Sequence, residues 1–371
     1  MVAVPQFGIT ERIVSIMTSE LKKIGERFAL KGEFCSYKQM TNGNINSTYQ
    51  VFYNENGAAH AYIFQRINQN VFKKPVEIMQ NIDKVTSHIL AKGGNSLNFY
   101  KTTDGENYLF DDAGGFWRVT DFIESVTFNS CEDTATISNV GAAFGEFQMQ
   151  LADFDGSLLF ETIPNFHNTK NRYEHFHAVV TADPVGRVSK VRIELEKLED
   201  LETRACELSV RYANGDFPIR VTHNDTKANN VLFDKVTLKP LVVIDLDTVM
   251  PGMAMYDFGD AVRFICNTAE EDEADLSKVS FDIEKFRAFA QGYIGQVKNA
   301  LTKDELDSLV LGAFSATVEL AVRFLDDYVN GDTYFKVLYP EHNLVRARCQ
   351  LTLALDILKK YDQLLDIVKD C

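Results

Sequence analysis

Two neighbouring stretches decide how this chain folds: VTHNDTKANNVLFD (residues 221–234) and LVVIDLDTVMPGMAMYDFGD (residues 241–260). Each is predicted to be a short apolar strand that ends in polar residues. In the first stretch, Asp225 is followed five residues later by Asn230, after which VLF resumes a strand. In the second, an apolar run brings Asp245 to the end of a strand. We therefore expect these three side chains to converge.

Such a set of side chains suits phosphoryl transfer from ATP. The reaction needs a carboxylate near the acceptor hydroxyl and oxygen ligands that hold magnesium across the phosphates. The catalytic loop of protein kinases has the same spacing, with a metal-binding Asp on the following strand. Ordinary turn chemistry is the alternative, because Asp and Asn are common in turns. The conjunction of both stretches with a glycine-bearing hairpin upstream favours phosphoryl transfer.

The tripeptide Asp-Phe-Gly at residues 257–259 also matches a metal-binding motif of protein kinases. It lies beyond MPGMAMY, too far from the strand that ends at Asp245 to replace it. We predict that Asp245 is the metal ligand and that residues 257–259 begin a helix that braces the loop.

The composition limits the classes of function. A chain of 371 residues is longer than most single-core domains, so two lobes are expected. Its formal charge of -15 argues against a nucleic acid or an anionic membrane as partner. No apolar run approaches the ~20 residues of a membrane helix, and no secretory signal is evident. Six scattered cysteines without a CxxC pair favour reduced thiols and a cytoplasmic location over disulfides or zinc.

The first third of the chain is rich in strand signals. Its strand-like stretches alternate apolar and polar residues, with TNGN and NENG as turns. After the third stretch, a helix is predicted, with Pro75 in its first turn and Gly93 just past its end. Together these elements predict a five-stranded antiparallel sheet with one inserted helix. Six strand-like stretches are candidates for the five strands: residues 34–40, 47–54, 58–67, 98–103, 107–112 and 116–123.

Beyond this region the apolar spacing becomes helical. One long pattern opens with a capping box formed by Thr302 and Glu305. The acidic run at 270–278 is most simply a solvated loop. The predicted fold class is α+β, with a nucleotide-binding lobe at residues 1–122 and a mainly helical lobe at residues 123–371 that carries the catalytic loop and the acceptor site. The helical patterns cover residues 137–154, 189–215, 301–331 and 342–368.

The stretches HNDTKANNVLFD and VIDLDTVMPGMAMYDFGDAVRF resemble the aminoglycoside phosphotransferase and choline kinase superfamily, and within it the N-acetylhexosamine 1-kinases. Similar strings, such as TNGNINSTY, GGFWRVTDFIE and ETIPNFHNTKNRYEHF, extend the resemblance over nearly the whole chain. It implies a two-lobed protein-kinase-like fold with a sheet-containing N-lobe and a larger helical C-lobe. It also implies transfer of the γ-phosphoryl of ATP, with Mg²⁺, to the anomeric hydroxyl of N-acetylglucosamine or N-acetylgalactosamine.

The resemblance assigns roles residue by residue. It makes Asp225 the catalytic base and makes Asn230 and Asp245 the magnesium ligands. It places adenine at the hinge TDFIE (residues 120–124). The nucleotide-binding residues are then Gly43, Gln65, Glu77, Asp121, Phe122 and Ile123. The residues around the bound hexosamine are Asn44, Phe264, Arg323 and Tyr334. Without the resemblance, we would interpret Arg323 as paired with Asp326 or Asp327, and the two aromatic residues as core packing.

Some positions depart from the family pattern. The nucleotide loop has a single glycine, Gly43, so phosphate binding by its backbone is less strongly indicated. Gln65 stands where the superfamily often has the Lys or Arg that holds the ATP phosphates. Arg66 is adjacent but faces the opposite side of the strand, and Glu77 is the candidate partner of any cation placed there. Asn44 stands where the hexosamine kinases have His.

Three alternatives stay open. A kinase of the same fold could act on choline, homoserine, methylthioribose or an aminoglycoside, and many acidic residues around the acceptor would favour a cationic one. A pseudokinase that only binds nucleotide is a second alternative, supported by the missing strand lysine. A metal-dependent hydrolase is the third, although such sites usually show clusters of His ligands.

Overall fold

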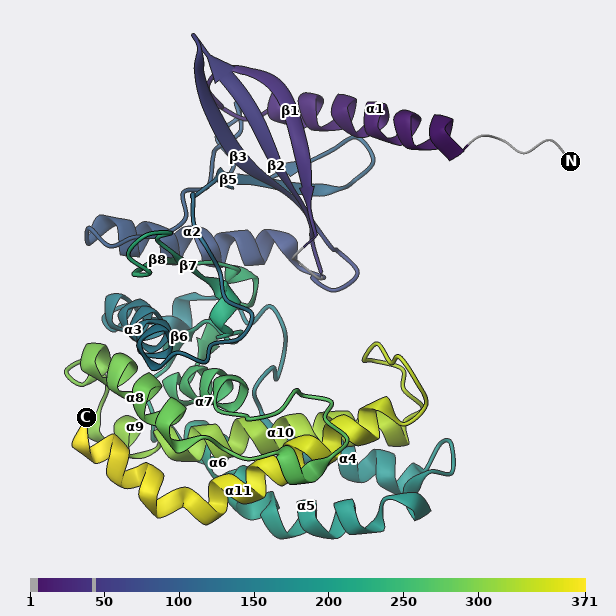
Figure 1. The fold of residues 1–371 in the computed structure, drawn as a ribbon, viewed down its shortest axis with the longest axis vertical. Coiled ribbons are helices and arrows are strands. Elements are labelled where there is room, and N and C mark those ends of the chain that lie inside the picture. Colours follow the sequence, from purple (N-terminus) through teal and green to yellow (C-terminus); the bar gives the residue numbers. More distant parts are fainter. Residues whose placement is uncertain (1–5, 42–44) are drawn as a thin grey trace, which may run out of the picture. The chain divides into compact units, whose positions relative to one another are not determined.

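The computed structural model describes residues 6–41 and 45–371, and the chain divides into two compact units. The N-terminal unit ends at Glu124 and the C-terminal unit begins at Ser125 (Figure 1). Among the described residues, no helix combines the length and apolar character needed to cross a membrane.

The N-terminal unit contains an antiparallel five-stranded sheet with the strand order β1-β2-β3-β5-β4. Helix α2 is inserted between β3 and β4 as predicted, with Pro75 as its first residue and Gly93 at φ +77° just beyond its end. Every second residue of β2 faces the core, where Tyr49, Val51 and Tyr53 are buried. The elements are α1 (Gln6–Gly25), β1 (Glu33–Met40), β2 (Ser47–Glu55), β3 (Ala58–Ile67), α2 (Pro75–Ala91), β4 (Leu109–Phe110) and β5 (Phe116–Asp121).

Two strand predictions in this unit were wrong in extent. Residues 98–103 form no strand and contribute only isolated bridges, from Phe99 to Thr120 and from Thr102 to Phe28. Residues 107–112 shrink to the two-residue strand β4. Alternation of apolar and polar residues also occurs in extended loops, so it cannot show whether a partner strand is aligned over the whole stretch. The N-terminal helix α1 was not predicted.

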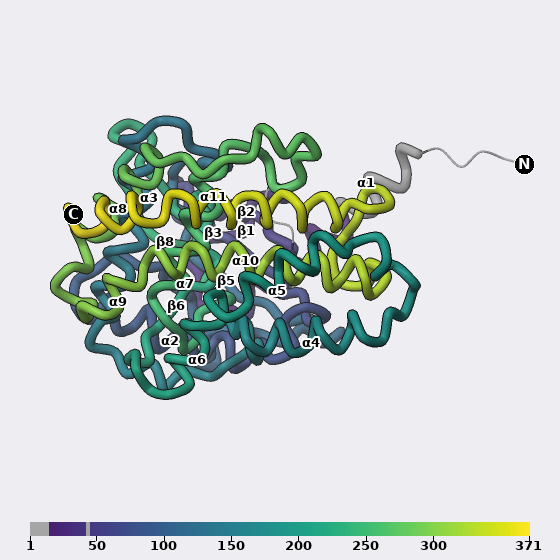
Figure 2. The backbone as a smooth tube through the Cα atoms, turned by 90° about the horizontal axis from the view of Figure 1, so that it is seen from below, coloured from purple at the N-terminus to yellow at the C-terminus, as the bar shows by residue number. Residues whose placement is uncertain are grey.

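The C-terminal unit is mainly helical. Figure 2 shows α10 and α11 running alongside each other, and each packs closely on the other. The capping box at Thr302 is present, but the predicted helix 301–331 is interrupted at Ser308 and forms α9 and α10. The helices are α3 (Thr134–Gln150), α4 (Thr169–Ala182), α5 (Arg192–Ala205), α6 (Glu207–Ala213), α7 (Ala254–Ile265), α8 (Ile283–Val297), α9 (Lys303–Asp307), α10 (Leu309–Val329) and α11 (His342–Asp370).

The polar loops of this helical unit connect the strands of two small antiparallel sheets. Strand β6 (Arg220–Thr222) pairs with β9 (Met250–Gly252), and β7 (Val231–Phe233) pairs with β8 (Pro240–Val243). The β6–β9 sheet is fixed to the helices by a buried ion pair, in which both ends of the Glu305 carboxylate accept from the Arg220 guanidinium at 2.9 and 2.7 Å.

Helix α7 lies unusually close to α10. A methyl group added at Gly259 would collide with the backbone carbonyl of Gly312, and one added at Gly312 would collide with that of Met255. Both helices therefore need glycine where they cross. Gly259, the last residue of the Asp-Phe-Gly tripeptide, is thus explained by helix packing.

Candidate active site

The predicted loop joins β6 to β7, and the strand after it leads to Asp245. The carbonyl of Asn230 accepts from the backbone N–H of Ile244 at 2.8 Å, which ties the end of the loop to the end of β8. Asp245 follows at φ +60°, in the left-handed region that few non-glycine residues adopt, and is exposed. The local strand–loop–strand arrangement agrees with the prediction from the sequence.

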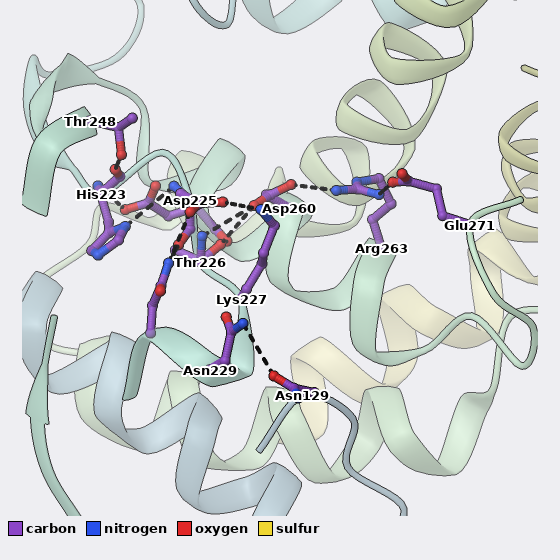
Figure 3. Close-up of polar contacts among 12 residues, drawn as sticks. Asn129, His223, Asp225, Thr226, Lys227, Asn229, Thr248, Asp260, Arg263 and Glu271 are labelled. Carbon is purple, nitrogen blue, oxygen red and sulfur yellow. Dashed lines mark hydrogen bonds and ion pairs between the residues drawn. The ribbon is translucent and has the colours of Figure 1, made fainter. Parts of the chain in front are cut away.

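Asp225 is held from two sides. The side-chain amide of Asn230 donates to the Asp225 Oδ2 at 2.9 Å and to the Asp225 backbone carbonyl at 2.8 Å. The Lys227 ammonium lies 2.8 Å from Oδ1 (Figure 3). Burial lowers the pKa of Lys227, but Asp225 outweighs that effect and keeps this pKa above its ordinary value. The base candidate is therefore oriented by an amide and a cation.

His223 fixes the backbone of the same loop and has a defined tautomer. Its Nε2 lies 2.9 Å from the carbonyl of Ile244, and its Nδ1 accepts from the backbone N–H of Asp225 at 3.3 Å. A carbonyl can only accept, so Nε2 carries the proton and Nδ1 does not. The hydroxyl of Thr248 donates to the His223 carbonyl at 2.6 Å (Figure 3).

Asp257 braces the loop from helix α7, as predicted for the Asp-Phe-Gly tripeptide. Its carboxylate accepts from two successive backbone N–H groups, those of His223 at 2.7 Å and Asn224 at 2.8 Å. The amide of Gln148 donates to it at 3.2 Å. Burial raises the pKa of Asp257, although these donors act in the opposite direction. Both carboxylate oxygens of Asp257 are therefore used by hydrogen-bond donors of the loop and of α3.

Charged side chains of helix α7 connect the loop to the acidic run at 270–278. Asp260 accepts from the backbone N–H of Thr226 at 3.1 Å and pairs with Arg263 at 2.8 Å. Arg263 also contacts Glu271 at 3.3 Å (Figure 3). Burial raises the pKa of Asp260, but Arg263 outweighs it and the net shift is downward. The acidic run at 270–278 is thus more than a solvated loop, because Glu271 is anchored to α7.

The residues predicted to bind metal offer oxygen donors. The Asn230 amide donates to Asp225 through Nδ2, which leaves its Oδ1 as an acceptor. Asp245 supplies a carboxylate. Oxygen donors suit a hard cation such as Mg²⁺, which takes few protein ligands and completes its coordination with phosphate and water. In the described residues, no cluster of three His, Cys, Asp or Glu side chains is arranged for a metal. A bound cation would therefore share its coordination with phosphate oxygens.

A cavity of ≈ 920 Å³ opens beside Asp225. Arg323 and Phe264 line it, and Tyr334 lies just outside its lining, with its ring centre 6.0 Å from the Arg323 guanidinium. Tyr334 is 74% exposed and Phe264 is 36% exposed, so neither is packed in the core. Of the predicted acceptor residues, the structure thus brings Arg323 and Phe264 together at the cavity.

The expected ion pairs of Arg323 do not form. Asp326 pairs with His175, and the buried Asp327 accepts from the backbone N–H groups of residues 333–335 at 2.8 to 2.9 Å. Asp327 thereby shapes the loop that carries Tyr334 at the edge of the cavity. Asn44, the remaining predicted acceptor residue, lies outside the described residues.

In the N-terminal unit, Gln65 is paired with an arginine that the sequence analysis missed. Arg118 lies directly opposite Gln65 in the β3–β5 register and donates from Nε to the Gln65 Oε1 at 2.9 Å. It is 2% exposed. Arg66 projects elsewhere, with its guanidinium 5.9 Å from the Trp117 ring. Only the register of the sheet identifies Arg118 as the cation beside Gln65.

The other predicted nucleotide residues have local partners. Glu77 pairs at 3.0 Å with Lys74, the residue just before helix α2. Asp121 accepts from the hydroxyl of Tyr100 at 2.6 Å. The backbone N–H of Phe122 donates to the carbonyl of Ala61 at 3.2 Å, so this group of the expected hinge is already used. Ile123 follows directly in the chain, and Gly43 lies outside the described residues.

Comparison with known proteins agrees with this geometry. The model of a family described as the phosphotransferase enzyme family matches residues 36–289, which include the entire loop and its brace. A structure of a microcompartment-associated aminopropanol kinase matches with a TM-score of 0.60 and 16% identity, covering 93% of this chain and 98% of that one. The protein-kinase-like fold, with its sheet-containing N-lobe and helical C-lobe, is thereby confirmed.

Two further solved structures show the same fold. A choline kinase from Cryptosporidium parvum matches with a TM-score of 0.52 and 16% identity, covering 96% of each chain. An amicoumacin kinase, solved with AMP-PNP and Ca²⁺, matches with a TM-score of 0.58 and 12% identity, covering 90% of this chain and 92% of that one. At these identities the likeness concerns the fold and leaves the acceptor open.

Proposed function

The chain belongs to the phosphotransferase enzyme family, and from this premise we propose that it transfers the γ-phosphoryl of ATP to the anomeric hydroxyl of an N-acetylhexosamine. The observation that carries the proposal is the position of Asp225. Its carboxylate is held by Asn230 and Lys227 and lies on the wall of a cavity that Phe264 and Arg323 also line. An aromatic ring and an arginine with free donors suit a neutral, hydroxyl-rich ring.

The charges of the cavity argue against a cationic acceptor such as choline or an aminoglycoside. Seven Asp or Glu residues line it, but Asp225, Asp260, Glu271 and Glu319 are each paired with Lys, Arg or His inside it. Arg323, in contrast, lies beside the Tyr334 and Phe335 rings and forms no ion pair within the described residues. Arg323 therefore places a positive charge at the cavity wall, which disfavours a cationic acceptor beside it.

In the proposed reaction, Asp225 accepts the proton of the acceptor hydroxyl while that oxygen attacks the γ-phosphorus and the bond to the β-phosphate oxygen breaks. The Asn230 amide holds the carboxylate in place, and the Lys227 ammonium lies where it can compensate charge that develops on the transferred group. Asn230 Oδ1 and Asp245 would hold Mg²⁺, which neutralises phosphate charge when it is bound. Most of the catalysis then comes from positioning and electrostatics.

A panel assay tests the acceptor. The protein is incubated with ATP and Mg²⁺ and with N-acetylglucosamine, N-acetylgalactosamine, choline, ethanolamine and kanamycin, and the products are identified by mass spectrometry and ³¹P NMR. The proposal predicts hexosamine 1-phosphates. Phosphorylation of an amine acceptor without any sugar phosphate would replace the sugar proposal with the cationic alternative, and ATP binding without any product would favour a pseudokinase.

Variants test the roles. Asp225→Asn should lower kcat by on the order of 10² to 10⁴ while ATP still binds. Asp245→Ala should weaken binding of the metal–nucleotide complex itself, measured by calorimetry. Asp362→Asn, at an exposed position of α11 away from the cavity lining, is the matched control. Equal and mild effects of the first two variants on turnover would contradict the assignment.

A further inference from the structure

The cavity extends well beyond the catalytic loop. Its ≈ 920 Å³ lies near the upper end of the range for drug-sized ligands, about 300 to 1,000 Å³, and exceeds what one hexosamine ring requires. One part of its wall is formed by Phe324 of α10, by residues 335–336 and by Arg346 and Gln350 of α11. This part can contact a substituent of the acceptor that does not react.

Unpaired positive charge distinguishes this wall. Six Lys or Arg residues line the cavity, and Lys227, Arg263 and Lys285 each form an ion pair with a carboxylate. Within the described chain, the other three form none: Arg323, Lys336 and Arg346. Glu132 and Glu273 are also paired, with lysines, which leaves Glu270 as the one lining carboxylate without an ion pair in the same residues. On the wall formed by α11 and residues 335–336, Lys336 and Arg346 therefore supply positive charge that no carboxylate of the described residues pairs.

Arg346 and Gln350 supply this wall with buried polar groups. Arg346 is held by a hydrogen bond to the carbonyl of Lys336 at 3.2 Å and by the Phe324 ring, 5.4 Å from its guanidinium carbon. Its buried Nε has no partner. Gln350 lies one helical turn further along, is 1% exposed, and its buried Oε1 also has no partner. A buried N–H without a partner is costly, so a ligand that accepts from the Arg346 Nε is favoured.

We propose that Lys336, Arg346 and Gln350 form a subsite that binds an anionic group, a carboxylate or a phosphate ester, on the acceptor. The Arg346 Nε–H and the Lys336 ammonium donate to the anion. No hydrogen bond of the described residues holds the Gln350 amide, so a 180° turn of this amide puts its NH₂ in the place of Oε1 as a third donor. The preferred acceptor is then a hexosamine that carries an acidic substituent. This inference rests on the proposed function, because it takes the cavity as the acceptor site.

Calorimetry with three sugars tests the subsite. Full-length protein is titrated with N-acetylglucosamine, its 6-phosphate and its 3-O-carboxymethyl ether, and the two charged sugars distinguish phosphate from carboxylate. At least one charged sugar should bind tenfold or more tightly than the neutral one. Arg346→Gln should weaken that ligand by a factor of about 10 to 100, as expected for a lost hydrogen bond to a charged group. Binding of the neutral sugar should not change.

Two further variants accompany Arg346→Gln, one as a control and one as a second test. Arg348 lies on the same helix, pairs with Glu194 at 2.7 Å and does not line the cavity. Arg348→Gln should therefore leave all three affinities unchanged. Lys336→Gln changes an exposed residue and tests the same subsite if Arg346→Gln does not fold. Equal affinities for charged and neutral sugars, unaffected by either subsite variant, would overturn the proposal.

The same ligands separate this inference from the proposed function. If a charged sugar binds through Arg346 but no sugar is phosphorylated, the subsite is supported and the proposed reaction fails. If the neutral sugar is phosphorylated and both charged sugars are excluded, the reaction is supported and the subsite is refuted.

Discussion

The substitution Asp257→Asn tests whether the catalytic loop depends on its brace. The wild-type carboxylate accepts the N–H groups of His223 and Asn224, one on each oxygen. An amide keeps one oxygen and replaces the other with an NH₂ group, which then faces an N–H donor. The variant therefore loses one hydrogen bond to a charged acceptor and leaves one backbone donor buried without a partner.

A hydrogen bond to a charged group contributes about 1.5 to 3 kcal/mol. Part of this loss is offset because the amide removes a buried charge, whose cost is visible in the raised pKa of Asp257. We expect the free energy of unfolding to fall by about 1 to 3 kcal/mol. Turnover should fall on the order of 10²-fold, because the backbone that positions Asp225 loses a fixed point.

The pH dependence follows from the sign of the pKa shift. A carboxyl whose pKa is raised by folding binds more protons in the folded state, so this group makes stability fall as pH rises from its unfolded pKa to its folded one. Asparagine does not titrate. The stability difference between wild type and Asp257→Asn should therefore be largest at acidic pH and should narrow as pH rises through that window.

Urea unfolding followed by far-UV circular dichroism measures these changes. The fluorescence of the single tryptophan, Trp117, is unsuitable because this residue lies in the N-terminal unit. Asp326→Asn is a suitable control, since burial also raises the pKa of Asp326 but this side chain contacts His175 and not the loop. A variant at position 257 with unchanged turnover and unchanged stability would refute the role of the brace.

Further substitutions test other parts of the C-terminal unit. Glu305→Gln should lower the free energy of unfolding by about 3 to 5 kcal/mol in urea, because it leaves the buried charge of Arg220 uncompensated. Gly259→Ala should lower it by about 1 to 3 kcal/mol, because its methyl group meets the backbone of α10; an unchanged midpoint would contradict the close crossing. Burial raises the pKa of Glu319, but His167 outweighs burial and the net shift is downward, so the stability from this pair should be lost as pH falls below the ordinary range of a glutamate. Glu319→Gln should flatten this acid dependence in unfolding curves from pH 6 to pH 3.

Much of the fold was predictable because local signals and global structure agree. Pro75 and the capping box at Thr302 mark true helix starts. The Asp-Phe-Gly tripeptide was assigned to a helix because of its distance from the preceding strand, and it lies in α7. In contrast, strand signals at 98–103 did not show that only isolated bridges form there. Local patterns indicate extended chain, whereas tertiary contacts decide whether it pairs.

The candidate site was predictable where residues are close in sequence and not where they meet through packing. The spacing of Asp225 and Asn230 indicated that their side chains converge, and the structure places the Asn230 Nδ2 2.9 Å from the Asp225 Oδ2. Arg118 could not be identified beside Gln65, because 53 residues separate them and only the sheet register brings them together. The α11 residues of the cavity gave no signal for the same reason, since Arg346 resembles any helix-surface arginine.

The hydrogen bonds from the His223 and Asn224 amides to Asp257 also predict how fast these amides exchange with solvent. His223 and Asn224 belong to no helix or strand, yet their amides are buried and bonded to a side chain of α7. Their exchange with solvent deuterium requires these hydrogen bonds to Asp257 to open, so they should exchange far more slowly than exposed loop amides. The backbone just before Asp225 should therefore move with helix α7, although it lies in a loop.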